Sequence, residues 1–272
     1  MTILDQILGD VREEVAASRL ARPLADLRSR IADAPPVNDF HAALAKPAFC
    51  LIAEIKERSP SVGPMRPQNV ADAAIIYEEC PLVEAISVLT NATHFGMSVG
   101  RLEKIRTRVS KPVLRKDFLI DEYQVREARA FGADAVLLMA NVLDSARLAG
   151  FYDLARELGM EALFEVHEEA EIAQLPPDAR IVGINSRKFK TQTGFVAAGQ
   201  ASKKDFSVDF SAFDLAEKLP NGVIRVAESG LTPASVREVS SVFHAGLVGT
   251  SLLRDERGVA ACLKEFAAVL SD

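Results

Sequence analysis

Several signatures of common protein classes are missing from this chain of 272 residues. Its cysteines, Cys50, Cys80 and Cys262, are widely spaced and form no CxxC pair, so zinc and dithiol chemistry are disfavoured and buried, reduced thiols are expected. Neither the GxGxxG nor the Walker A pattern occurs, which argues against a doubly wound nucleotide-binding sheet. No short tandem repeat occurs, which argues against solenoids and propellers.

Long apolar runs and concentrated positive charge are also absent. Unbroken apolar stretches such as residues 135–140, which no other exceeds in length, are too short to span a bilayer, and the first twenty residues are too charged for a signal peptide. The net charge is −6, the pI is about 5.4, and the basic residues are scattered, which disfavours a nucleic-acid surface. We expect a cytoplasmic protein, a monomer or weak homo-oligomer, with a small-molecule partner and no membrane or nucleic-acid partner.

Histidines in metal-ligand spacing are lacking as well. His41, His94, His167 and His244 are dispersed, and no HxH or HExxH motif occurs. His167, in the sequence VHEEAE, is expected to cap a helix or to face solvent. The sequence therefore predicts no metal site.

The first 48 residues are predicted to be helical. Apolar residues recur at helical spacing from Ile3 to Val15, and a second helix is predicted from Pro23 until Pro35 and Pro36 stop it. Because these apolar stripes need a surface to cover, we expect the two helices to form an extension that packs on the rest of the chain.

From residue 50 onward, short β-rich runs alternate with helical patterns. The predicted strands are 50–56, 84–90, 112–116, 135–139, 161–166, 180–185, 223–227 and 245–248. The predicted helices include 70–79, 99–109, 122–131, 145–158, 212–219 and 233–240. Eight strands alternating with helices indicate an α/β protein with a (β/α)8 barrel, forming one domain over residues 1–272.

Polar residues end several of these strands. Glu54 and Lys56 close the first strand, before a turn that starts near Ser59. They could form an exposed ion pair on an edge strand, but the same arrangement recurs at later strands. Strand ends converge in a barrel, so we expect one polar ring that also includes Lys116, Glu165, Asn185, Arg187, Glu228, Ser229, Gly249 and Thr250.

This ring could carry acid–base chemistry and bind phosphate. Partial burial is expected to lower a lysine pKa toward the range of a general acid, and a Schiff-base lysine, as in a barrel aldolase, stays an alternative. The glycines and hydroxyls of ESG at 228–230 and VGTS at 248–251 suit a phosphate at the loops after strands seven and eight.

The connection after the sixth strand is unusually long. Residues 191–207 are rich in Gly, Ala, Ser and Lys and follow the carboxyl end of a strand. They could form a lid over the catalytic face or a surface insertion without a role.

With these residues in view, the sequence closely resembles the indole-3-glycerol phosphate synthase family nearly end to end. The motifs that carry the resemblance are ILDQI, NDFHAAL, IAEIKERSPSVG, AISVLT, PVLRKDFLIDEYQV, GADAVLLM, LFEVHEEAE, GIN, VAESG and LVGTSLL. The resemblance implies that 1-(2-carboxyphenylamino)-1-deoxyribulose 5-phosphate is converted into indole-3-glycerol phosphate with loss of CO2 and water, in tryptophan biosynthesis. It implies no cofactor.

The resemblance also implies roles for individual residues. Lys116 in LRKDF matches the general acid and Glu165 in FEVH its acid–base partner, while Lys56 matches a second active-site lysine. Glu54 and Asn185 are expected to orient the substrate ring and its surroundings. The remaining expected contacts are Ser59, Pro60 and Phe118 around the ring, Arg187 in the polar network, and Ser229, Gly230, Gly249 and Thr250 around the phosphate, with Glu228 beside them.

The chain departs from the family pattern at a few places. Asn91, His94 and Met97 lie in a loop that is expected to flank the ring, and residues 191–207 exceed the usual loop length. Two alternatives therefore stay open: a paralogous barrel that acts on another aryl-amino or ketose phosphate, and a non-catalytic phosphosugar-binding barrel. The smaller sister isomerase of the pathway lacks the EIK, RKD and EVH set.

Overall fold

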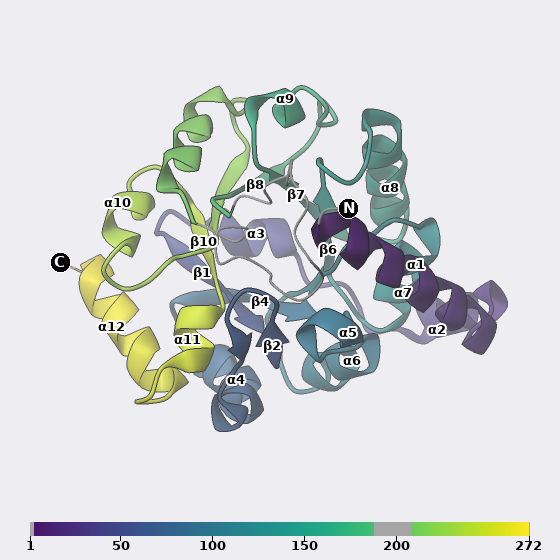
Figure 1. The fold of residues 1–272 in the computed structure, drawn as a ribbon, viewed down its shortest axis with the longest axis horizontal. Coiled ribbons are helices and arrows are strands. Elements are labelled where there is room, and N and C mark those ends of the chain that lie inside the picture. The colour runs from purple at the N-terminus through teal and green to yellow at the C-terminus, as the bar shows by residue number, and fades with distance from the viewer. Residues whose placement is uncertain (1–2, 188–207, 272) are drawn as a thin grey trace, which may run out of the picture.

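The computed structural model describes residues 3–187 and 208–271. Eight parallel strands close into a barrel in the order β1-β10-β9-β8-β7-β6-β5-β4 (Figure 1). They span β1 Cys50–Ile55, β4 Val83–Leu89, β5 Val113–Lys116, β6 Ala135–Met139, β7 Glu161–Val166, β8 Ile181–Asn185, β9 Ile224–Glu228 and β10 Ala245–Val248. The predicted barrel and its eight strands are confirmed, with shifts of one residue at several ends.

Helices follow the strands around the outside of the barrel. They are α4 Pro67–Glu79, α6 Val99–Arg106, α7 Glu122–Ala130, α8 Ser145–Glu157, the 3-10 helix η2 Phe210–Lys218, α10 Val236–Ser240 and α12 Val259–Ser271. Short acidic side chains start three of them, because Asp121, Asp144 and Asp209 accept hydrogen bonds from backbone N–H groups of the first turn. The segment predicted as an ordinary helix over residues 212–219 is instead part of this 3-10 helix, which ends at Lys218.

Several short helices and strands were given no residue range in the prediction from sequence. They are α3 Phe40–Leu44, the hairpin of β2 Arg58–Ser59 and β3 Gly63–Pro64, α5 Ala92–Phe95, α9 Glu169–Ile172 and α11 Thr250–Arg254. Elements of two to five residues contain too few positions to display a period. Most of them lie in loops after strands, where they shape the mouth of the barrel.

The two N-terminal helices are α1 Ile3–Ala21 and α2 Leu24–Asp33. Ile7, Val11 and Val15 of α1 are buried in the common hydrophobic core, as the expected packing requires. In Figure 1, α1 crosses in front of β6 at the mouth of the barrel. The extension therefore covers part of the mouth as well as a flank.

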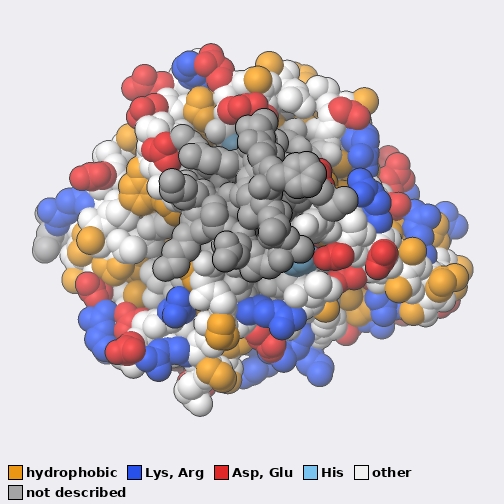
Figure 2. Space-filling view, viewed as in Figure 1, with side chains coloured by type: hydrophobic (Ala, Val, Ile, Leu, Met, Phe, Trp, Pro, Cys, Tyr) orange, Lys and Arg blue, Asp and Glu red, His pale blue; other side chains and the backbone are white. Residues whose placement is uncertain are grey.

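Burial is complete along the first strand. All six residues of β1 are buried, between β4 on one side and β10 on the other. The interpretation of Glu54 and Lys56 as an exposed pair on an edge strand is therefore wrong. Among the described residues, no helix is long and apolar enough to cross a membrane. On the face shown in Figure 2, acidic and basic side chains of the described residues are interspersed.

Candidate active site

A cavity of about 310 Å³ opens at the carboxyl ends of the barrel strands. This volume is at the lower end of small-molecule pockets, which measure roughly 300–1,000 Å³. Every site residue predicted from the sequence lines it: Glu54, Lys56, Ser59, Pro60, Lys116, Phe118, Glu165, Asn185, Arg187, Glu228, Ser229, Gly230, Gly249 and Thr250. The long segment 191–207 lies outside the described residues.

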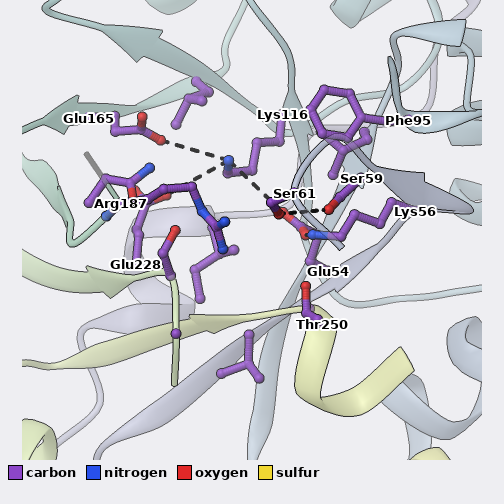
Figure 3. Close-up of a pocket in the computed structure, with 18 of the residues that line it drawn as sticks. Glu54, Lys56, Ser59, Ser61, Phe95, Lys116, Glu165, Arg187, Glu228 and Thr250 are labelled. Carbon is purple, nitrogen blue, oxygen red and sulfur yellow. Dashed lines mark hydrogen bonds and ion pairs between the residues drawn. The ribbon is translucent and has the colours of Figure 1, made fainter. Parts of the chain in front are cut away.

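Lys116 occupies the centre of the polar part of the cavity (Figure 3). Its ammonium nitrogen lies 3.7 Å from Glu165 Oε2 and 3.9 Å from Glu54 Oε2. The distance to Glu228 Oε2 is 4.0 Å. Three carboxyl groups from strands β1, β7 and β9 thus surround one lysine that comes from β5.

These neighbours determine the charge of Lys116. Burial alone would lower the pKa of its ammonium group, but the carboxylates of Glu165 and Glu54, with a smaller contribution from Glu228, outweigh burial and raise that pKa above its ordinary value. The expectation that the net pKa of a site lysine is lowered is therefore wrong for Lys116. Charge from three different strands outweighs desolvation here, and this balance cannot be seen from local sequence.

Buried charged neighbours fix the end of β5. Arg115 donates from Nη1 to Glu127 Oε2 at 3.0 Å and from Nε to Thr90 Oγ1 at 3.0 Å. Asp117 accepts from Thr90 Oγ1 at 2.5 Å and from the Phe118 backbone N–H at 2.9 Å. Because Arg115 and Asp117 flank Lys116, these bonds hold the backbone from which the lysine projects.

Glu165 and Glu228 form a pair of buried carboxyl groups with opposite pKa shifts. Burial and the charge of Glu165 raise the pKa of Glu228 well above its ordinary value. Burial would also raise the pKa of Glu165, but the positive charges of Lys116 and His167 outweigh burial and lower it. Of this pair, Glu165 is therefore the carboxyl group that ionises more readily, and Glu228 is the one that holds its proton more firmly.

Glu54 lies between two lysines. Its Oε1 pairs with Lys56 Nζ and its Oε2 faces Lys116 (Figure 3). Burial would raise the pKa of Glu54, but the charges of Lys56 and Lys116 lower it, so Glu54 is ionised. Asn185, at the end of β8, accepts a hydrogen bond from the Arg187 backbone N–H at 3.0 Å. Burial lowers the pKa of the Arg187 guanidinium although the charge of Glu54 opposes this shift.

The loops after β9 and β10 form the predicted phosphate end of the cavity. Ser229 and Gly230 have φ angles of 72° and 74°, in the left-handed region that residues other than glycine rarely adopt. Thr250 begins α11, and the first N–H groups of a helix have no carbonyl partner within it. Backbone donors and the Thr250 hydroxyl can thus face an anion from two adjacent loops.

The cavity also has apolar lining residues, and it receives residues from the β2–β3 hairpin. Ser59 Oγ lies 3.0 Å from Ser61 Oγ, a bond that closes the hairpin beside Pro60. Phe118 follows β5 and completes the expected ring contacts. Apolar side chains that the sequence analysis did not assign to the site also line this cavity: Ile7, Leu89, Phe95, Leu137, Met139, Leu231, Val248 and Leu247.

Two of these lining residues, Ile7 and Phe95, show why the sequence did not predict the whole lining of the cavity. Ile7 belongs to the predicted stripe of α1, but periodicity does not tell which surface a stripe covers. Phe95 belongs to the loop after β4 whose sequence differs from the family pattern. In this loop Asn91 caps α5 and Met97 is buried. Ser61, by contrast, lies in the same SPSVG turn as Ser59 and could have been included on that ground.

His167 is placed differently from the expectation. It neither caps α9, whose N-cap is Glu168, nor faces solvent, because its side chain is 12% exposed. Its Nε2 lies 3.4 Å from Glu165 Oε1, and its Nδ1 lies 3.6 Å from Glu171 Oε2. The ring therefore lies between Glu165 and Glu171, a placement that a helical wheel cannot show.

Within the described part of the chain, no cluster of three or more His, Cys, Asp or Glu residues has the arrangement of a metal site. The carboxyl groups of the cavity surround a lysine instead. The cavity offers a charged lysine, carboxyl groups that differ in how readily they ionise, and apolar lining residues. Together with the anion cradle, these features suit acid–base chemistry on a phosphorylated compound that carries an aromatic ring.

Sequence relatives agree with this description. A model of the family described as indole-3-glycerol phosphate synthase matches residues 4–266. Proteins with that name from Kineococcus radiotolerans and Micrococcus luteus are each 41% identical to this chain. The first match covers 94% of this chain and 92% of its relative, and the second covers 93% of each.

Solved structures with lower identity share the barrel. The 3-hexulose-6-phosphate synthase of Salmonella typhimurium has a TM-score of 0.58 at 15% identity and covers 82% of this chain and 99% of its own. The N-(5'-phosphoribosyl)anthranilate isomerase of Pyrococcus furiosus has a TM-score of 0.55 at 14% identity, with the same coverage. These likenesses concern the fold alone, whereas the cavity residues and the sequence relatives agree on one conclusion: the chain belongs to the indole-3-glycerol phosphate synthase family.

Proposed function

We propose that this enzyme converts 1-(2-carboxyphenylamino)-1-deoxyribulose 5-phosphate into indole-3-glycerol phosphate, CO2 and water, without a cofactor. The observation that carries the proposal is the charged Lys116 at the centre of three carboxyl groups, beside an apolar wall. The substrate phosphate binds at Ser229, Gly230, Gly249 and Thr250, and its ring lies toward Ser59, Pro60 and Phe118.

Ring closure requires an acid at the substrate carbonyl. The ring carbon that carries the carboxylate attacks the ketose carbonyl carbon, and the Lys116 ammonium stabilises and protonates the oxygen as negative charge develops. Loss of CO2 then returns the electron pair to the ring and restores its aromaticity. Lys56, on the far side of Glu54, faces the substrate carboxylate in this arrangement, and Glu54 and Asn185 orient the ring.

Dehydration requires an acid and a base on the same intermediate. The hydroxyl group formed in the first step leaves as water when it is protonated while a base removes a proton. Glu165 is the base because it is ionised and lies 3.7 Å from Lys116. The water carries away the hydroxyl oxygen, and the new ring double bond completes the indole.

The Schiff-base alternative is disfavoured by charge. A lysine must be neutral to attack a carbonyl, and the carboxylates around Lys116 raise its pKa instead. The non-catalytic barrel is disfavoured because a phosphosugar binder does not need Lys56, Lys116 and Glu165 in one cavity.

The decisive experiment is turnover of the carboxyphenylamino-deoxyribulose phosphate, followed by the fluorescence of the indole product. Lys116→Ala is expected to fold normally and to lose about 10²–10⁴-fold in kcat, the usual contribution of general acid–base catalysis. Lys104→Ala, which removes an exposed lysine on α6, serves as the matched control. Unchanged turnover in Lys116→Ala would remove this residue from the acid role, and binding without turnover in the unaltered protein would favour the paralogue.

We also propose that the protein works in the cytoplasm as a monomer or weak homo-oligomer. A biosynthetic family that acts on a small phosphorylated substrate supports this location. Sedimentation across a range of concentrations tests the oligomeric state, and cell fractionation tests the location.

A further inference from the structure

His167 is a buried histidine that the proposed reaction does not use. It follows β7 directly, two positions after Glu165, and its side chain is 12% exposed. The ring lies between two carboxyl groups, because Nε2 is 3.4 Å from Glu165 Oε1 and Nδ1 is 3.6 Å from Glu171 Oε2. These distances are those of charge contacts, which are strong only when the imidazole is protonated.

Glu171 is well placed to hold this ring. It lies on α9, is almost fully buried, and its Oε2 also accepts a hydrogen bond from the His167 backbone N–H at 2.6 Å. The same carboxylate oxygen therefore contacts both the backbone and the ring of one residue. This double contact fixes the ring's position relative to β7, and hence its approach to Glu165.

The charge balance at the ring favours the imidazolium. The titratable groups that face it and act most strongly on its charge include Glu165 on β7, Glu171 on α9 and Lys116 on β5. Burial and the Lys116 charge lower the pKa of His167, but the two glutamates outweigh them and raise it above its ordinary value.

Glu165 consequently has a positive group at each carboxylate oxygen. Lys116 Nζ is 3.7 Å from Oε2, and His167 Nε2 is 3.4 Å from Oε1. Glu228, the other carboxyl group of the pair, contacts the same lysine at 4.0 Å. Among the described ion pairs, Glu165 has a contact with His167 and Glu228 has none.

We propose that His167 is a positioning residue which, as an imidazolium held by Glu171, makes Glu165 and not Glu228 the ionised member of the carboxyl pair. The inference rests on the proposed function, since it assigns the origin of the base that dehydration needs. The arrangement follows the general logic in which a base is oriented by a second group and that group by a third. His167 itself transfers no proton to the substrate.

The first test is independent of activity. Proton NMR of the imidazole C2–H signals, assigned by the loss of one signal in His167→Gln, gives the pKa of each histidine. His167 should titrate above the ordinary value of about 6.5, and Glu171→Gln should lower its pKa by about one unit. An ordinary or lower pKa of His167, or no response to Glu171→Gln, would overturn the proposal whether or not the protein turns over the proposed substrate.

The second test uses the pH profile of kcat/KM, which reports groups of the free enzyme. Without the imidazolium, the ionised form of Glu165 is less stable and its pKa rises. The acid limb of His167→Gln should therefore move upward by about one pH unit, with about a tenfold loss on that limb that recovers at higher pH. Glu171→Gln, which keeps the ring, should move the limb in the same direction.

A structural role alone predicts a different result. If His167 only packs, His167→Gln would lower kcat/KM by the same factor at every pH, and parallel profiles would contradict the proposal. His41→Gln, which removes a half-buried histidine on α3 outside the cavity, should leave the profile unchanged. Absence of turnover in the unaltered protein would contradict the proposed function and leave the NMR test in force.

Discussion

At the scale of single residues, two glycines determine where the carboxyl groups of the cavity lie. A Cβ atom on Gly183 of β8 would lie 2.0 Å from Glu228 Oε1, and one on Gly249 would lie 2.4 Å from Glu54 Oε1. Neither separation is possible for non-bonded atoms. The absence of a side chain at these positions therefore lets the carboxyl groups approach Lys116.

Gly183→Ala is accordingly predicted to damage catalysis. The new methyl group would push the Glu228 carboxyl group away from Lys116 and Glu165, and a misplacement of about 1 Å in an active site costs about 10²-fold in rate. We expect a fall of that size in kcat/KM, measured by product fluorescence, with near-native circular dichroism.

The matched control is Gly150→Ala in α8, where nothing lies within 4 Å of the added Cβ. It should keep full activity and stabilise the helix by roughly 0.5–1 kcal/mol. Activity within twofold of the unaltered protein in a folded Gly183→Ala variant would show that Glu228 does not need its present position.

The polar ring was predictable from the sequence because strand ends converge in a barrel and the ionisable residues stand at those ends. The charge states were not predictable. Lys116 owes its raised pKa to carboxyl groups from β1, β7 and β9, so its value depends on distances that exist only in the closed barrel. His167 was missed for the same reason, since its partners come from a strand end and from a four-residue helix.

At the scale of secondary structure elements, side-chain hydrogen bonds and an ion pair connect α1 to the loop after β4. Glu14 accepts from Asn91 Nδ2 at 2.9 Å and from Thr93 Oγ1 at 3.0 Å. His94 Nε2 lies 2.9 Å from Asp10 Oδ2. The residues that depart from the family pattern thus hold the helix that brings Ile7 to the cavity.

We predict that Glu14→Ala weakens substrate binding through this helix. Loss of the three hydrogen bonds that the Glu14 side chain accepts from Asn91 and Thr93, each worth about 1 kcal/mol, should loosen α1 and raise KM several-fold with little change in kcat. Steady-state kinetics measure the change.

Glu13→Ala on the same helix is the control, because Glu13 is exposed. An unchanged KM in Glu14→Ala, or an equal rise in Glu13→Ala, would mean that the fastening of α1 has no part in binding. Helical spacing predicted α1 and its buried stripe, but the bonds that align it belong to α5, whose four residues show no period.

At the scale of the whole molecule, the described part of the N-terminal extension, residues 3–48, is joined to the barrel by contacts at several places. Tyr123 donates from its hydroxyl group to the Ser18 and Arg22 carbonyl oxygens at 2.9 and 3.0 Å. Arg22 pairs with Glu127, and Asn38 donates from its backbone N–H to Asp134 at 2.8 Å. Such contacts tie the extension to helices and turns on several sides.

We therefore predict that the chain unfolds as one domain. Hydrogen exchange across a urea series, followed by mass spectrometry, should give the same midpoint for peptides from α1 and from β1. If α1 peptides lose protection at a clearly lower urea concentration, the extension is a separate unit that docks on an independently stable barrel.

The pairing of β1 with β10 has a consequence for how the protein is made. Glu54 and Gly249 touch each other although they lie near opposite ends of the barrel sequence. A nascent chain leaves the ribosome with its N-terminus first. β1 therefore cannot pair with β10 until almost all of the chain has been translated. The cavity cannot exist in a prematurely released chain, and a truncated product would carry two unpaired strand edges that invite aggregation.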